Sequence, residues 1–271
     1  MTIKARNRIN IVFSIIAIAV TALQIILMLY QLIFNKLEIP QVYLQKKSSV
    51  FLFEYKPIFV IIGVVLLDFY VIAASIFLHN MFEKTQSAEV IFFLMFLAAC
   101  LCDSTRILVP IFKVANTFSR FLMQLAYVTL FARILAPLSL LGSTVLTDDD
   151  ARQNVDRNCI FIIITALFFA KLIPFNTAVV YPNFCISYGN TTTLRYSSFF
   201  ICLASMSALI INNKKNEYGQ KTTIGFALLA VGYSAIFYCY NLFNLLFGSL
   251  CLIGGTYIYL ISLHRQYLWL D

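Results

Sequence analysis

The chain has 271 residues, of which 61% are hydrophobic and only 12% are charged, and its formal net charge is +8. An ordinary soluble domain is about 25% charged, so this chain carries too few charged groups to cover a water-soluble surface of its size. The composition argues against a soluble enzyme, a nucleic-acid-binding domain and a secreted disulfide scaffold. It predicts an all-α, polytopic membrane protein in a lipid bilayer, with its basic excess in the loops.

A transmembrane helix needs about 20 apolar residues to cross a hydrocarbon core of roughly 30 Å. Residues 1–271 contain eight such runs and no appended soluble domain, so we predict a single integral membrane domain. The predicted spans are residues 10–34, 57–79, 90–112, 119–142, 159–181, 196–211, 222–240 and 244–263. Seven spans are the alternative, in which the short run 196–211 is re-entrant.

The first span follows Lys4, Arg6 and Arg8, a pattern that also precedes the apolar segment of a signal peptide. Its apolar run is longer than the roughly 7–15 residues of a signal segment, so we expect it to be retained. With the N-terminus inside, ten Lys and Arg residues outside the spans lie on the cytoplasmic side and seven lie opposite. This bias predicts that both termini are cytoplasmic, and we expect a bacterial inner membrane.

The last apolar stretch, Thr222–Leu263, carries no charged residue. As one helix it would be about 63 Å long, which is twice the thickness of the hydrocarbon core. We therefore divide it into two spans with a tight turn around residues 240–244. Asn241 and Asn244 supply the polar side chains that such a turn uses.

The loops and the metal-ligating residue types predict no cofactor and no metal site. Residues 35–56 are expected to lie in the membrane interface. The acidic run 148–150 is expected to be a solvated, helix-capping loop rather than a cation site. Most of the seven cysteines lie in apolar runs without zinc-site spacing, and the two histidines, His79 and His264, are isolated.

Five ionisable residues fall inside the predicted spans, and they are the candidate site. They are Asp68, Asp103, Arg106, Arg133 and Lys171. A lone charge in the middle of a bilayer costs at least about 2.5–3.5 kcal/mol, so these residues should converge inside the bundle and find partners. Asp103 and Arg106 are three residues apart and can pair on one helix face. Asp68 then has Arg133 or Lys171 as its partner, and one base is left over.

A repeated sequence places proline after three of these charges. Arg-Ile-Leu-Val-Pro begins at Arg106, Arg-Ile-Leu-Ala-Pro begins at Arg133, and Lys171 begins a shortened form. Proline removes one helical hydrogen bond and bends a helix, which frees a carbonyl close to each buried cation. In lipid this irregular backbone should line an interior cavity. The predicted kinks are at Pro110, Pro137 and Pro174.

The leading hypothesis is a protein that binds or moves a small anionic solute or protons through a midplane cavity lined by the five charges. A structural network of ion pairs that only fixes the helix register is an equally supported interpretation of the same residues. The chain has no H-E-x-x-H, G-x-S-x-G or Walker A motif, so an enzyme is not the expected class. The alternative function is a non-catalytic sensor, assembly or accessory subunit that acts through a membrane protein partner.

Overall fold

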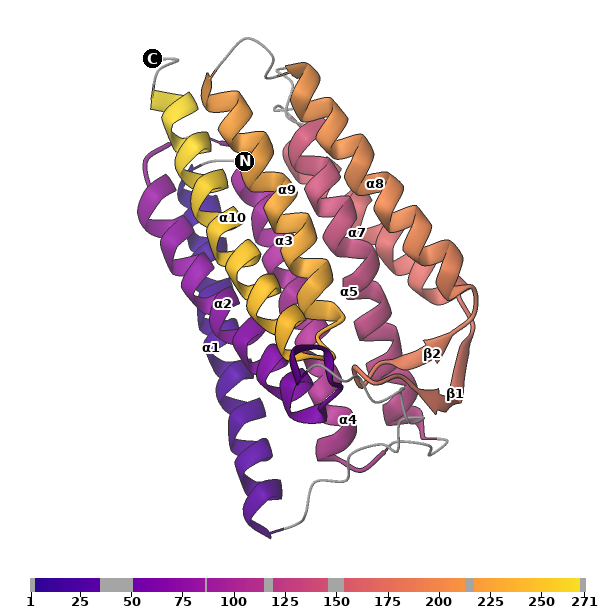
Figure 1. The fold of residues 1–271 in the computed structure, drawn as a ribbon. Coiled ribbons are helices and arrows are strands. Elements are labelled where there is room, and N and C mark those ends of the chain that lie inside the picture. Colours follow the sequence, from indigo (N-terminus) through magenta and orange to yellow (C-terminus); the bar gives the residue numbers. More distant parts are fainter. Residues whose placement is uncertain are drawn as a thin grey trace.

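The computed structural model of the chain describes residues 3–34, 51–85, 87–114, 119–145, 154–212 and 217–268. Most of these residues are helical, and the helices form an elongated bundle (Figure 1). The helices are Ile3–Phe34 (α1), Pro57–Phe82 (α2), Glu89–Ser104 (α3), Leu108–Ile111 (α4), Arg120–Val145 (α5), Val155–Leu172 (α7), Thr191–Asn212 (α8), Glu217–Phe237 (α9) and Leu242–Leu268 (α10). Two 3-10 helices, Phe51–Phe53 and Thr105–Ile107, and two antiparallel strands, Phe175–Val180 (β1) and Ile186–Tyr188 (β2), complete the described part. Most of the predicted interfacial loop and the acidic run 148–150 lie outside the described residues.

Six helices of the described part are long and apolar enough to cross a membrane, which indicates an integral membrane protein and confirms the all-α class. They are α1, α2, α3 together with α4, α5, α8 and α10. The helix α7 is not among them because three of its 18 residues, Asp156, Arg157 and Lys171, are charged. The helix α9 is not among them because its first turns, up to Lys221, are polar. The predicted number of eight spans is therefore not confirmed, although a helix occupies at least part of each.

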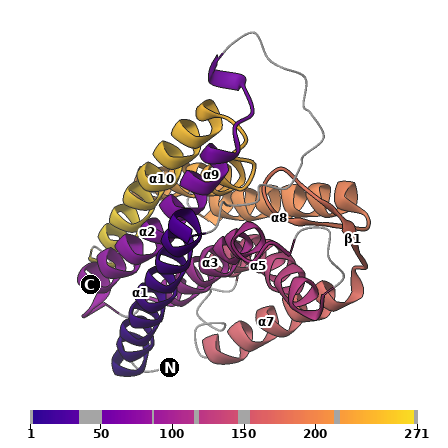
Figure 2. The ribbon, with the colours of Figure 1, turned by 90° about the horizontal axis from the view of Figure 1, so that it is seen from below.

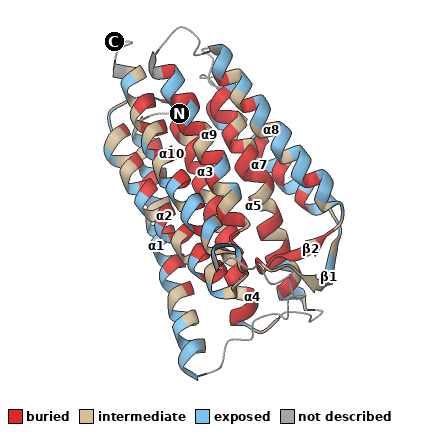
Figure 3. Cartoon of the chain, viewed as in Figure 1, coloured by how far each residue is buried: buried red, intermediate tan, exposed pale blue. Residues whose placement is uncertain are grey.

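The helix α3 lies at the centre of the bundle. It packs against α5 and α2, while α7 and α8 pack on α5 and α1 packs on α2 (Figure 2). The helices α9 and α10 form a close pair, in which α10 contacts α2 and α9 contacts both α8 and α2. Burial follows this order, because α3 and α5 are mostly buried whereas α1 and α8 expose most of their apolar side chains (Figure 3). Such apolar exposure suits helices that face lipid, since lipid tails are as apolar as leucine.

The predicted fifth span, 159–181, is wrong in its second half. The helix α7 ends at Leu172, Ile173 is extended, and β1 begins at Phe175 and pairs with β2 as a hairpin. Pro174 explains this end, because proline has no N–H to donate and disfavours helical geometry in the residue before it. The predicted kink at Pro174 is therefore also wrong, since this proline follows the helix instead of bending it.

The other two prolines affect their helices differently. Before Pro110 the helix tightens into the 3-10 turn Thr105–Ile107, and the short α4 follows. Pro137 lies inside α5, which continues as one helix from Arg120 to Val145. A proline inside a helix always removes one hydrogen bond. Only at Pro110 is that loss accompanied by a change of helix type.

The uncharged C-terminal stretch divides into two helices, as the sequence predicted. The helix α9 ends at Phe237, α10 begins at Leu242, and Asn241 Oδ1 accepts a hydrogen bond from Asn244 N at 2.9 Å. Asn244 Nδ2 in turn donates to Tyr238 O at 2.8 Å. The two asparagines therefore supply the turn and the helix cap that their positions predicted.

Glycines allow α9 and α10 to approach each other closely. A Cβ atom added at Gly225, Gly232 or Gly255 would lie 2.6–2.7 Å from a backbone nitrogen of the facing helix. By contrast, a Cβ atom added at Gly254 would meet no atom within 4 Å. Small residues at such contacts are typical of membrane helices. This backbone contact fixes the position of α9, whose end borders the candidate site.

Arg6 connects the start of α1 to the end of α2 by hydrogen bonds. In the sequence it indicates only the orientation of the first span. Arg6 is buried, and its guanidinium donates to Thr85 O at 2.6 Å and to Phe82 O. Carbonyls at the end of a helix have no partner within the helix and carry partial negative charge. A buried arginine at that position is therefore stabilised by the helix that it holds.

Candidate functional site: a charged cluster inside the bundle

Four of the five predicted site residues meet inside the bundle. Asp68 comes from α2, Asp103 from α3, Arg106 from the 3-10 turn after α3, and Arg133 from α5. Asp68, Asp103 and Arg106 are buried, and Arg133 is half-buried. These four residues are called the charged cluster below. Their convergence is what the high cost of an isolated charge in lipid requires.

Asp103 and Arg106 pair within their own segment, as their spacing predicted. Asp103 Oδ2 lies 3.9 Å from Arg106 Nη1, and both side chains are fully buried. Asp68 interacts with this pair and with the Ser104 hydroxyl. The sequence predicts Arg133 or Lys171 beside Asp68, whereas the base that interacts electrostatically with Asp68 in the structure is Arg106. The reason is the packing order. The helix α2, which carries Asp68, packs directly on α3, whereas α5, which carries Arg133, packs on α3 and is not among the helices that pack on α2.

Arg106 also holds the end of α9. Its Nη1 donates to Phe237 O at 3.0 Å, and its Nη2 lies 3.4 Å from Ile236 O. Both carbonyls belong to the last turn of α9, where helix carbonyls lack partners and the helix dipole is negative. The buried cation is therefore stabilised from two directions, by Asp103 and by the helix end.

Arg133 is held by aromatic rings instead of by an acid. Its guanidinium carbon lies 3.8 Å from the centroid of Phe237, whose ring also has Arg106 at 4.9 Å. Arg133 Nη2 donates to Tyr238 OH at 3.0 Å. Within the described ranges no carboxylate lies within 4.0 Å of Arg133. A cation over an aromatic face is stabilised by about 0.5–2 kcal/mol. This is less than the stability that a protein can lose when one partner of a buried ion pair is removed.

Lys171, the fifth predicted residue, does not join the cluster. It is exposed in the last turn of α7, and its Nζ lies 4.0 Å from the ring centroid of Tyr127. The prediction placed Lys171 near the middle of a span, but the helix ends one residue later because of Pro174. The surplus base expected in the cluster is therefore absent from it, and two acids face two bases.

The carboxylates of the cluster accept few hydrogen bonds. In the described part of the chain, no donor reaches Asp68 Oδ1 or either carboxylate oxygen of Asp103. Ser104 Oγ accepts a bond from Gln24 Nε2 at 3.3 Å and donates to Leu101 O at 2.8 Å. A hydroxyl has one hydrogen, so Ser104 cannot also donate to Asp68 without releasing Leu101 O. A protonated Asp68 would remove this conflict, because it could itself donate to Ser104 Oγ.

The β1–β2 hairpin brings residues to the cluster that the sequence analysis did not identify. Asn183 Nδ2 donates to Phe237 O at 3.3 Å, and the buried Cys185 thiol lies against the Arg106 guanidinium. Burial raises the pKa of the Cys185 thiol to about 11, although the charge of Arg106 opposes this shift. The available signal was the Tyr-Pro-Asn sequence at 181–183, which is typical of a turn.

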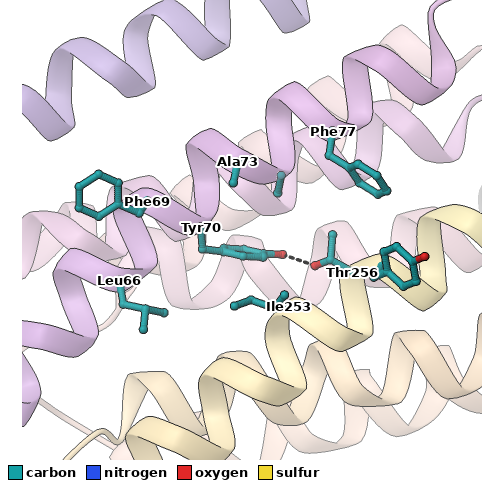
Figure 4. Close-up of a pocket in the computed structure, with 9 residues that line it drawn as sticks. Leu66, Phe69, Tyr70, Ala73, Phe77, Ile253 and Thr256 are labelled. Carbon is teal, nitrogen blue, oxygen red and sulfur yellow. Dashed lines mark hydrogen bonds between the residues drawn. The ribbon is translucent and has the colours of Figure 1, made fainter.

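A cavity of about 360 Å³ lies between α2 and α10 (Figure 4). Its lining is mostly apolar, and two of its polar atoms, Tyr70 OH and Thr256 Oγ1, are hydrogen-bonded at 2.7 Å. Phe69 and Tyr257, which also line it, are exposed. None of the cluster residues lines this groove, so it is not the charged midplane cavity that the sequence predicted.

The fold and the charged cluster define a helical, multi-pass membrane protein with buried, mutually compensating charges. Among the described residues, no group of three His, Cys, Asp or Glu side chains could hold a metal ion. Comparison with known proteins adds no closer identity, since no family model, curated protein or solved structure matches this chain. Its function is therefore argued from the geometry of the cluster.

Proposed function

We propose that this protein binds or moves protons at the charged cluster, in a bacterial inner membrane and with both termini on the cytoplasmic side. Two ligands are compatible with the sequence of these residues, a small anionic solute or protons. The geometry of the cluster favours protons. The observation that carries the proposal is the set of buried carboxylate oxygens on Asp68 and Asp103 that no described donor reaches.

The unsatisfied groups of the cluster have the chemistry of a proton site. An anion needs free donors, whereas most of the fully buried, unsatisfied atoms of the cluster are carboxylate acceptors, with Arg106 Nε as the exception among the described residues. A buried acceptor without a partner costs about 1–3 kcal/mol, and a proton shared among these oxygens would recover part of that cost. Buried carboxylates commonly form proton relays in membranes.

Proton flux into liposomes tests the proposal. Purified protein is reconstituted with a pH-sensitive dye inside the vesicles, and the initial rate of acidification is measured after an acid pulse. We expect Asp68→Asn and Asp103→Asn to lower that rate by about tenfold or more, because neither amide can carry the proton. Glu89→Gln is the matched control, since Glu89 is buried in α3 outside the cluster and accepts a hydrogen bond from Tyr267 OH at 2.6 Å.

A second measurement separates binding from loss of the fold. Infrared spectroscopy of folded protein should show a protonated carboxylic acid band that disappears in Asp68→Asn. The size-exclusion profile and the unfolding temperature of each variant report whether it folds. Folded variants with wild-type flux and an unchanged carboxylic acid band would contradict the proposal. Variants that lose both stability and expression would support the purely structural network instead.

A second candidate function is a sensor, assembly or accessory subunit that acts through a membrane protein partner. The observation that favours it is the apolar groove between α2 and α10, which is open at Phe69 and Tyr257. A partner helix could pack there, since close packing drives association between helices in lipid. Ala73→Phe would fill the groove, and it should release a co-purifying partner while leaving proton flux unchanged.

A further inference from the structure

A second group of positive charge overlaps the charged cluster at Arg133 and extends from it to Tyr238 and Arg195. The ring centroid of Tyr238, in the turn after α9, lies 5.6 Å from the guanidinium carbon of Arg133 and 5.2 Å from that of Arg195. Arg133 Nη2 also donates to Tyr238 OH at 3.0 Å. Arg195 is exposed near the start of α8, while Arg133 and Tyr238 are half-buried, so this group borders the surface.

Most of the N–H and O–H donors of these three side chains have no acceptor in the described part of the chain. No carboxylate of the described ranges lies within 4.0 Å of Arg133 or Arg195. Because the Tyr238 oxygen accepts its bond from Arg133, its own O–H hydrogen is left to donate elsewhere. Each guanidinium carries five N–H donors, and among the described residues only one bond, from Arg133, is formed. The group therefore contrasts with the charged cluster, where acceptors lack donors.

The balance of charge at this place favours an anion. Among the described residues, neither Arg133 nor Arg195 has a carboxylate within 4.0 Å, so two bases meet here without a paired acid. The helix α8 begins at Thr191, one turn before Arg195. The start of a helix carries partial positive charge, and helical side chains lean toward that end. Arg195 and the start of α8 therefore add to the same positive field.

We propose that Arg133, Tyr238 and Arg195 bind a phosphate group. Guanidinium groups form paired, charge-assisted hydrogen bonds with phosphate oxygens. Phosphate presents several acceptor oxygens on one centre, which suits the two guanidinium groups and the phenol better than a carboxylate with two oxygens. The group reaches the site as a lipid headgroup or as a soluble phosphate. This site goes beyond the proton function and shares only Arg133 with it.

Binding of inorganic phosphate to the purified full-length protein in a neutral detergent is the first test. We expect phosphate to raise the unfolding temperature, and we expect Arg195→Gln to weaken its apparent affinity by about tenfold or more. Arg195 is exposed, so this variant should fold normally. Arg120→Gln is the matched control, because Arg120 is an exposed arginine at the start of α5 outside the site.

Lipid retention is the second test, and it distinguishes the two sources of the phosphate. Native mass spectrometry counts phosphatidylglycerol molecules that remain bound to wild type and to Arg195→Gln after release from nanodiscs. If Arg195→Gln weakens the binding of inorganic phosphate, the result supports a soluble ligand. If Arg195→Gln lowers the number of retained lipids, the result supports a lipid headgroup. Equal losses in Arg120→Gln and Arg195→Gln, or no loss in either assay, would overturn the site. Neither result depends on the proton flux, because Arg195 lies outside the charged cluster.

Discussion

Arg106 and Arg133 begin nearly identical five-residue segments, and yet their surroundings differ. Arg106 is fully buried, pairs with Asp103 and holds two carbonyls at the end of α9. Arg133 is half-buried, packs on aromatic rings and makes one described hydrogen bond, to Tyr238. The repeated sequence therefore does not determine the role of its arginine, because the partners come from other elements. Arg106 acts as an anchor of the fold, whereas Arg133 keeps donors for a ligand.

The largest effect is expected from Arg106→Met, which would leave Asp68 and Asp103 buried without their nearest base. Removing one partner of a buried ion pair costs about 3–5 kcal/mol. We expect a loss of stability of that size in detergent unfolding experiments. The double variant Arg106→Met with Asp103→Asn should lose less, because it removes the uncompensated charge as well. The contrast between the two arginines fails if Arg106→Met costs no more than Arg133→Met.

The next effect tests the contact that places the end of α9 beside both arginines. Alanine at Gly255 would bring its Cβ to 2.7 Å from Leu229 N, so the two helices would have to separate. Overpacking of this kind costs about 1–3 kcal/mol. Gly254→Ala is a matched control one residue away, where a Cβ meets no atom within 4 Å. Equal unfolding temperatures for the two variants would show that α9 is not held by this contact.

A smaller loss is expected from Arg133→Met, which removes a cation from aromatic faces and breaks no described ion pair. One hydrogen bond and the contact with the rings together account for about 1–2 kcal/mol. We therefore expect a folded variant with a modestly lower unfolding temperature and with weakened phosphate binding. Arg133→Lys keeps the charge and should restore part of both properties. A severe loss of folding in Arg133→Met would place Arg133 in the same structural role as Arg106.

Local sequence was sufficient for the features that depend on neighbours in the chain. The pairing of Asp103 with Arg106 follows from their spacing on one helix turn, and the turn at Asn241 and Asn244 follows from side-chain capping. The general class followed from composition, because too few charges are present for a soluble surface. These predictions required no knowledge of which helices pack together.

The predictions that the structure does not confirm depend on how the helices pack together or on the effect of proline on the residue before it. A mid-span position for Lys171 requires Pro174 to be a kink inside the helix, but proline also disfavours helix in the residue before it, and α7 ends at Leu172. The partner of Asp68 could not be predicted, because it depends on α2 packing against α3. The role of Arg195 depends on Tyr238, which is distant in sequence and approaches it only through the fold. Contacts between residues that are distant in the chain produce no periodic pattern in a single sequence, so they cannot be predicted from it.

Cys185 offers the least invasive test, because it probes whether the surroundings of Arg106 are sealed while those of Arg133 are open. Its thiol is buried against Arg106, and burial raises its pKa from an ordinary 9.0 to about 11. The thiolate is the reactive form, so maleimide at neutral pH should leave Cys185 unmodified in the native protein and label it after denaturation. Mass spectrometry of the peptide measures both reactions.

The same shift gives a pH dependence with a definite sign. A folded pKa above the unfolded value means that the neutral thiol contributes its full stability below about pH 9. That contribution is lost as the pH rises through about 11, and Cys185→Ala should make the alkaline loss of stability shallower. Rapid labelling of native Cys185 at neutral pH would mean that the hairpin tip does not cover Arg106. The two arginines would then be equally accessible, and burial could no longer explain why one anchors the fold and the other binds a ligand.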